Sequence, residues 1–240
     1  AGLAEVSEPT ISRLCHKLEC EGYTDFKLKL AQQISSGGQL YVEHMNASDN
    51  TQTIINKILS SIETSVRSMQ RTISPQSIEA ATDLLISSRS IYFFGVGASG
   101  PVALDAQHKF FRFGIPVVAQ TDYINQRMMC SMLGPEDAAV FISYTGRTTA
   151  IVESAALAAA QGARTIGLTR LRSPLAKHCR EVLNAVSSED TDLYTPMTSR
   201  IIHLALIDIL ATSVALRLGA QVEKNITAIK RNLRATRQEN

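Results

Sequence analysis

The chain has 240 residues, 45% of them hydrophobic and 19% charged, which is typical of a soluble globular protein with one or two domains. The formal net charge of +2 excludes DNA binding through a uniformly basic surface, so any DNA contact must be local. The four cysteines form no C-x-x-C pair, so they do not indicate a zinc site and predict reduced thiols in the cytoplasm. No metal is expected, and a cofactor is expected only under the dinucleotide-binding alternative given below. No signal peptide opens the chain, and no apolar run reaches membrane-spanning length.

The first 34 residues carry the pattern of two short helices. Ser7 can cap the first helix, and Pro9 suits its first turn. The spacing of one buried face recurs at Ile11, Leu14, Cys15 and Leu18. A second helix is expected at residues 25–34, and residues 35–50 hold two helix-breaking clusters that predict a linker. The opening residues 1–7 have the character of the middle of a folded unit, so we expect N-terminal residues to be missing.

The outward face of the first helix carries short polar and cationic side chains, which are the residue types that read base edges and phosphates. They are Thr10, Ser12, Arg13, His16 and Lys17. An ordinary solvated helix face would look the same. Residues 1–34 hold four basic and five acidic side chains, so this stretch is not a basic patch.

Residues 51–240 are expected to form one domain. A helix with an apolar stripe over residues 54–73 is followed by another that opens at Ser74-Pro75 and runs to about residue 88. Short apolar runs then alternate with amphipathic stretches. The runs are 90–95, 115–119, 138–143, 164–169 and 183–187, and the stretches are 100–113, 122–133, 148–161 and 174–179. This alternation predicts an α/β fold with a doubly wound, five-stranded parallel sheet flanked by helices. A helical pattern over residues 198–234, broken near Gly219, closes the chain.

A glycine-rich turn follows the first predicted strand. Gly95, Gly97 and Gly100 give the pattern G-x-G-x-x-G, with Ala98 and Ser99 inside it. Asp122 follows near the end of the next strand, as in dinucleotide-binding proteins. An NAD-dependent oxidoreductase is therefore one alternative, although it rests on this pattern alone.

A second turn, after the third predicted strand, is rich in hydroxyl groups. It runs from Ser143 through Tyr144, Thr145, Gly146 and Arg147 to Thr148 and Thr149. Backbone N–H groups at a helix N-terminus attract anions, and hydroxyls add donors without adding charge. The alternative is that a threonine only caps the helix. Both turns follow strands that can meet at the switch point of a doubly wound sheet, so Ser99 would face the hydroxyl-rich turn.

Four groups of residues resemble the RpiR family of transcriptional regulators. Residues 6–15 with Gly22-Tyr23 and Phe26-Lys27 are similar to the family's recognition helix and the turn after it. Residues 143–148 resemble the phosphosugar-binding loop of the SIS (sugar isomerase) domain, and residues 105–113 and 189–194 extend the likeness. The resemblance implies the C-terminal part of a helix-turn-helix domain at residues 1–34, a linker at 35–50 and an SIS domain with flanking helices at 51–240.

The resemblance is closest to regulators of glucose catabolism and implies a sugar-phosphate effector, 2-keto-3-deoxy-6-phosphogluconate of the Entner–Doudoroff pathway. Ser99 and Ser143 would bind this effector, with Gly97, Ala98 and residues 144–148 around them. Operator DNA would contact Ser7, Thr10, Ser12, Arg13 and Lys17, provided that the N-terminal domain is intact. The absence of enzymatic activity is also implied, and no membrane partner is expected. A homodimer is expected because the apolar stripe over residues 54–73 and the apolar helix over residues 201–216 offer surface for a subunit contact.

For some candidate residues the sequence leaves both a functional and a structural role open. Arg147 can pair with the effector's phosphate or carboxylate, or it can be a solvent-facing arginine. Lys109 and Arg112 are expected at the surface or in a dimer contact rather than at a ligand. Glu189 and His203 are the best acid/base pair if the protein is a phosphosugar isomerase, which is the main alternative function on this fold.

Overall fold

The computed structural model describes residues 8–18, 20–27, 45–185, 187 and 197–234. The chain divides into two compact units, with the division between Leu59 and Ser60.

The first unit contains α1 (Glu8–Lys17) and helical residues 23–27. The chain folds back over one side of α1, because the N–H of Cys20 donates to the carbonyl of Cys15 at 2.9 Å. Cys15 and Cys20 are therefore buried, whereas Leu14 and Leu18 are 53% and 52% exposed. The expectation that both leucines face inward is wrong for the described residues, because the returning chain covers the side of the helix that carries Cys15.

Two helices precede the sheet. The amide oxygen of Asn50 accepts the N–H of Thr53 at 2.9 Å and so caps α3 (Thr51–Thr72). In the second half of α3, Ser65 and Met69 are buried. The predicted start of the next helix, α4 (Pro75–Ile86), is confirmed, since the Ser74 hydroxyl accepts the N–H of Ser77 at 3.2 Å.

The second unit is built on a five-stranded parallel sheet, as predicted. Its strands are β1 (Ser90–Gly95), β2 (Val117–Gln120), β3 (Asp137–Ile142), β4 (Arg164–Thr169) and β5 (Glu181–Asn184). The strand order is β2-β1-β3-β4-β5, so the direction of winding reverses between β1 and β3. β1 and β4 have the predicted bounds, while β5 begins two residues earlier than expected.

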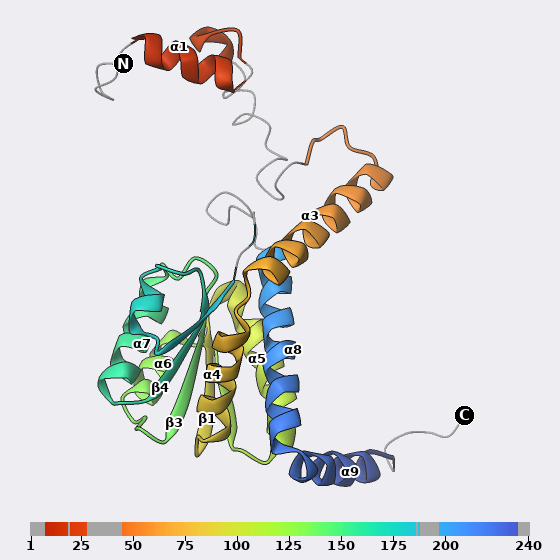
Figure 1. Cartoon of the computed structure of the whole chain (residues 1–240), viewed down its shortest axis with the longest axis vertical. Coiled ribbons are helices and arrows are strands. Elements are labelled where there is room, and N and C mark those ends of the chain that lie inside the picture. Colours follow the sequence, from red (N-terminus) through yellow and green to blue (C-terminus); the bar gives the residue numbers. More distant parts are fainter. Residues whose placement is uncertain (1–7, 19, 28–44, 186, 188–196, 235–240) are drawn as a thin grey trace. The chain divides into compact units, whose positions relative to one another are not determined.

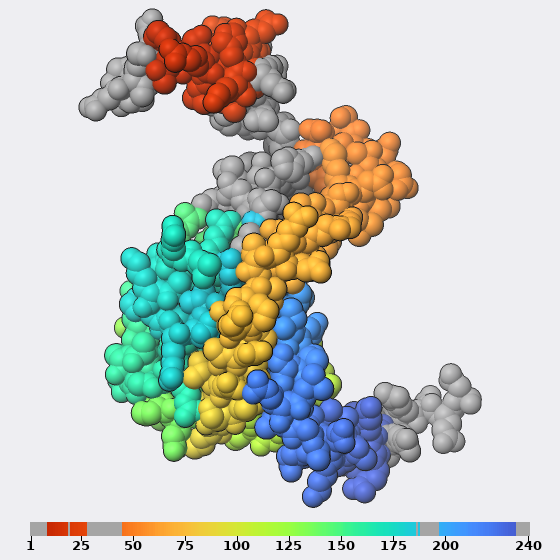
Figure 2. Space-filling model, viewed as in Figure 1, coloured from red at the N-terminus to blue at the C-terminus, as the bar shows by residue number. Residues whose placement is uncertain are grey.

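Helices cover both faces of the sheet (Figure 1). The larger apolar cluster joins one face to α4, α5 (Gly100–Phe110) and α8 (Thr198–Leu218), with Phe93 and Phe110 among its fully buried side chains. The other face packs against α6 (Tyr123–Cys130) and α7 (Thr149–Ala160) around Phe94 and Phe141. In the space-filling view α4 (gold) and α8 (blue) lie side by side (Figure 2).

The helix α8 is the one element among the described residues that is long and apolar enough to cross a membrane by length and composition. The expectation that no apolar run reaches membrane-spanning length is wrong for α8. Its apolar residues surround the helix because it packs into the protein, where Ile202, Leu206 and Leu210 are fully buried. Gly219, at φ +55°, then separates α8 from α9 (Ala220–Arg234) near the predicted break.

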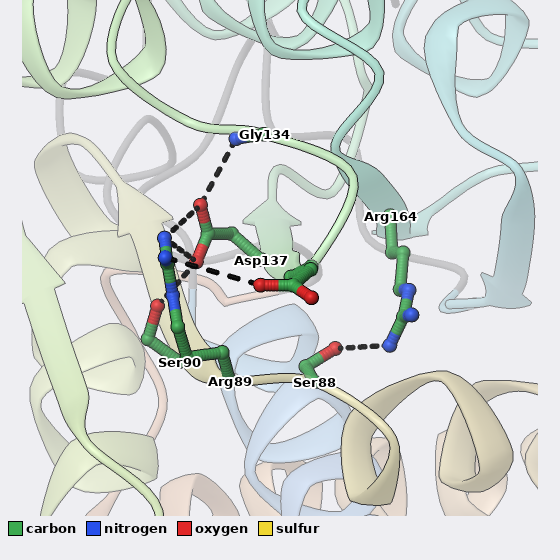
Figure 3. Close-up of polar contacts among 7 residues, drawn as sticks. Ser88, Arg89, Ser90, Gly134, Asp137 and Arg164 are labelled. Carbon is green, nitrogen blue, oxygen red and sulfur yellow. Dashed lines mark hydrogen bonds and ion pairs between the residues drawn. The ribbon is translucent and has the colours of Figure 1, made fainter.

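The amino ends of the strands are joined by a polar cluster around Asp137 (Figure 3). The Asp137 carboxylate accepts hydrogen bonds from the Ser90 hydroxyl at 2.6 Å, the Gly134 N–H at 2.9 Å and the Arg89 guanidinium at 3.1 Å. Beside it, the Arg164 guanidinium donates to the Ser88 hydroxyl at 3.2 Å. The cluster ties the starts of β1, β3 and β4 together, and its members satisfy one another.

Candidate functional site

The two predicted ligand turns follow neighbouring strands. β1 and β3 pair in parallel up to Gly95 and Ile142, so both turns leave the same edge of the sheet at the switch point. The first turn is a 3₁₀-helix (Gly97–Ser99) that leads into α5. Gly97 is exposed, and Ala98 and Ser99 are half-buried. Topology thus places the Ser99 turn beside the hydroxyl-rich turn, where ligands of doubly wound sheets bind.

The hydroxyl-rich turn connects β3 to α7. Ser143 is buried, with its N–H donating to the Leu168 carbonyl at 3.2 Å, whereas Arg147 and Thr148 are exposed. Thr148 occupies the N-cap position of α7, yet its side chain makes no cap hydrogen bond within the described part of the chain. The Thr145 hydroxyl accepts the N–H of Arg147 at 3.4 Å. The simple capping interpretation therefore leaves the hydroxyl of Thr148 unexplained.

Gly146 lets this turn pack closely on the loop after β4. Its φ of +62° lies in the left-handed region, and an added Cβ would overlap the hydroxyl oxygens of Thr169 and Ser173. These two hydroxyls lie 3.2 Å apart, and the Gly146 carbonyl accepts the N–H of Leu175 at 3.0 Å. Thr169 and Ser173 were not predicted from the sequence, because nothing in the spacing of the chain shows this approach.

The side chain of Tyr144 points away from solvent. Its hydroxyl donates to the Ser187 carbonyl and accepts the N–H of Ser187 at 3.2 Å. The Arg170 guanidinium lies over the Tyr144 ring, 4.5 Å from its centroid, and donates to the hydroxyl at 2.7 Å. Tyr144 thus joins the turn after β3 to the loops after β4 and β5, and Arg170 is a charged neighbour that the sequence analysis did not select.

His203 of α8 lies behind the same turn. It is 2% exposed, packs edge-to-face on Tyr144, and shares the Leu168 carbonyl with the N–H of Ser143. Burial lowers the pKa of His203 to about 4, and the hydrogen bond to Leu168 opposes this shift only in part. The ring is therefore neutral at physiological pH. Its proposed acid/base partner, Glu189, lies outside the described residues.

Other candidates take part in contacts within the fold. The Asp122 carboxylate accepts the N–H of Asn125 at 2.9 Å and caps α6, so it is already engaged in the place where a dinucleotide site would use it. Lys109 is mostly buried and binds Asp105 at 2.7 Å and also Asp208, so it links α5 to α8. Arg112 contacts His108 at 2.8 Å.

The predicted DNA-contacting residues lie on α1, apart from Ser7, which lies outside the described residues. Thr10, Ser12, Arg13 and Lys17 are all exposed. The helix therefore presents these polar side chains at its surface, as a recognition helix requires.

Family models match two parts of the chain. The helix-turn-helix domain of the rpiR family matches residues 1–37, and the SIS domain matches residues 84–213. The transcriptional regulator HexR of Pseudomonas aeruginosa is 45% identical over 99% of this chain and 83% of its own length. HexR of Escherichia coli K12 is 40% identical over 98% of this chain and 81% of its own length.

This chain belongs to the RpiR family of transcriptional regulators. The family assignment agrees with the fold, since an RpiR-type helix-turn-helix model matches the part that contains α1 and the SIS model matches the sheet. The NanR protein of Vibrio vulnificus, solved in complex with ManNAc-6P, has the same fold. It matches with a TM-score of 0.73 at 23% identity, over 98% of this chain and 84% of that one. The predicted fold class is thereby confirmed.

Proposed function

We propose that this RpiR-family regulator binds a sugar phosphate at the carboxyl edge of β1 and β3, and that this ligand controls the binding of operator DNA by the N-terminal segment. The effector we propose is 2-keto-3-deoxy-6-phosphogluconate, so the regulated genes would serve glucose catabolism through the Entner–Doudoroff pathway. The protein would act in the cytoplasm.

The observation that carries the proposal is the turn from Ser143 to Thr148. It combines the N-terminus of α7 with several hydroxyls at the switch point, next to the turn that holds Ser99. Helix N–H groups and hydroxyls can surround a phosphate dianion and donate to its oxygens. Arg147, exposed in the same turn, would add a cation for the phosphate or for the effector's carboxylate.

Calorimetry on single-residue variants tests the phosphate site. Ser143→Ala and Ser99→Ala should each weaken binding of the effector by about 1.5–3 kcal/mol, since each removes a hydrogen bond to a charged group. Thr72→Ala, far along the chain in α3, serves as a hydroxyl-deletion control and should keep the wild-type affinity. Wild-type affinity in both serine variants would refute the assignment.

The proposal also requires coupling between ligand and DNA. We expect the effector to release the protein from its operator, with a coupling free energy of about 1–3 kcal/mol. Glucose 6-phosphate, which lacks the carboxylate, should release DNA less well. Fluorescence anisotropy on a chain with a complete N-terminal domain measures this effect, and an unchanged DNA dissociation constant at saturating effector would rule it out.

We further propose that the protein is a homodimer, because a palindromic operator is met by two recognition helices about one DNA turn apart. Exposed Ile54, Ile55 and Leu59 on α3 supply apolar surface for such a contact. Sedimentation that finds only monomer at micromolar concentration would contradict this part. We propose no enzymatic activity: the His203 ring is buried away from a substrate, and its pKa of about 4 makes it a weak base.

A further inference from the structure

Arg170 is attached at both ends to a residue of the hydroxyl-rich turn. It is the first residue after β4, and its backbone N–H donates to the Tyr144 carbonyl at 3.2 Å. Its guanidinium stacks on the Tyr144 ring and donates to the phenol oxygen at 2.7 Å. A cation is thus held on the side chain of Tyr144, the residue that follows Ser143 in the hydroxyl-rich turn.

Tyr144, on which this guanidinium stacks, is itself held in place. Tyr144 is 6% exposed, its hydroxyl is bonded to both backbone groups of Ser187, and its ring contacts His203. An arginine held on such a support loses less conformational freedom on binding a ligand than a mobile side chain would. The position of the charge is therefore set before any ligand arrives.

Most of the hydrogen-bonding capacity of Arg170 is unused. The side chain is exposed, and no carboxylate pairs with it in the described part of the chain. A guanidinium has five N–H donors in one plane, and the phenol engages one of its nitrogens. The remaining donors form the fork that matches the two oxygens of a carboxylate.

We infer that Arg170 forms a second anionic subsite, which binds the carboxylate of the proposed effector. This inference rests on the proposed function and assigns the two charges of the ligand separately. The phosphate occupies the turn of hydroxyls and helix N–H groups, and the carboxylate pairs with Arg170. Arg170 is thus the residue that distinguishes a sugar-acid phosphate from a neutral sugar phosphate of similar size.

Calorimetry with two probes tests the assignment on the full chain. 6-Phosphogluconate carries a phosphate and a carboxylate, and glucose 6-phosphate carries the phosphate alone. The wild-type protein should prefer 6-phosphogluconate by about tenfold or more, which is the size of one charge-assisted hydrogen bond. Arg170→Gln should abolish this preference by weakening 6-phosphogluconate binding, while the affinity for glucose 6-phosphate stays nearly unchanged.

Matched variants separate a specific contact from a general effect of charge. Arg172→Gln removes the same charge from an exposed residue of the same loop and should keep the preference. Arg170→Lys should restore it only in part, because an ammonium group lacks the planar fork. Thermal unfolding of each variant checks that the fold is intact. If Arg170→Gln does not fold, the ligand preference of Arg170→Lys tests the role of Arg170 in its place.

The possible failures are distinct. An equal loss for both ligands in Arg170→Gln, or a lost preference in Arg172→Gln, would overturn the role of Arg170 while leaving the phosphate site standing. A preference that depends on Arg147→Gln instead would assign the carboxylate to that residue and overturn the inference. If neither these two ligands nor 2-keto-3-deoxy-6-phosphogluconate binds the wild-type protein, the proposed function fails together with the role of Arg170.

Discussion

The two edges of the sheet use polar residues in opposite ways. At the amino edge, Asp137, Ser90, Arg89 and the Gly134 N–H satisfy one another (Figure 3). At the carboxyl edge, Thr148 stands at a helix start without capping it and Arg170 carries a charge paired with no carboxylate, as far as the described residues show. Polar groups that pair internally stabilise the fold, whereas polar groups that converge with unused capacity indicate a ligand.

The largest expected effect of a substitution lies at the carboxyl edge. Gly146→Ala should lower the free energy of unfolding by about 4 kcal/mol, because a left-handed backbone and an overlap with neighbouring atoms each cost about 1–3 kcal/mol. The overlap involves Thr169 and Ser173. Urea denaturation measures this change.

Gly97→Ala is the matched control for Gly146→Ala. Gly97 has a similar φ of +55°, but a Cβ there meets no described atom within 4 Å. Only the backbone cost of about 1–3 kcal/mol should remain. If the two variants are equally stable, the close packing of the hydroxyl-rich turn on the β4 loop does not stabilise the protein.

The next largest expected effect is a dependence of stability on pH, caused by His203 behind the carboxyl edge. His203 has its pKa lowered from 6.5 to about 4 by burial, so the unfolded chain takes up a proton there before the folded protein does. The contribution of neutral His203 to the free energy of unfolding is therefore fully present above pH 6.5. The free energy of unfolding should fall by about 3 kcal/mol as the pH drops towards 4. In His203→Gln this phase should vanish from denaturation curves recorded against pH. Exposed His16→Gln should retain it, and a phase that survives in His203→Gln would show that another group causes it.

The smallest expected effect is at the amino edge. Burial raises the pKa of Asp137, but hydrogen bonds from Ser90, Gly134 and Arg89 lower it by more, so the carboxylate stays ionised to unusually low pH. The contribution of the ionised Asp137 carboxylate to the free energy of unfolding is present above the ordinary pKa of aspartate. It is lost as the pH falls through the lowered pKa. Asp137→Asn should cost about 2 kcal/mol at neutral pH, because the amide offers one acceptor where the carboxylate offered two.

Substitutions at the two edges should differ in their effect on ligand affinity. Asp137→Asn should leave sugar-phosphate affinity unchanged, since the cluster lies at the edge remote from both turns. Glu136→Gln, at an exposed neighbour that is 3.9 Å from Arg89, controls for the loss of one negative charge and should change neither stability nor affinity. Weakened ligand binding in Asp137→Asn would show that the edges are not independent.

The fold was largely predictable because strand and helix patterns are local. The bounds of β1 and β4 were predicted, and the break near Gly219 was recognised from a single glycine. The packing of the N-terminal segment was not predictable, because periodicity identifies the apolar side of α1 but not the part of the chain that covers it. Leu14 and Leu18 are exposed for that reason, and the returning chain covers Cys15 instead.

The candidate site was predictable only where it is continuous in sequence. The turn from Ser143 to Thr148 reads as one motif, and the topology of the sheet placed the Ser99 turn beside it. Arg170 and Ser173 meet this turn through contacts that span more than 25 residues, so no spacing rule could have selected them. The cluster around Asp137 was missed for the same reason.

The reversal of winding between β1 and β3 has a mechanical consequence. The helices that follow these two strands, α5 and α7, lie on opposite faces of the sheet although their first turns lie side by side. A small molecule that draws the two turns together would therefore pull on both helix layers of the protein at once, in opposite directions. Opposed forces of this kind displace the two layers relative to each other rather than moving one of them alone. A ligand that reached only one turn would produce no such relative displacement, however tightly it bound.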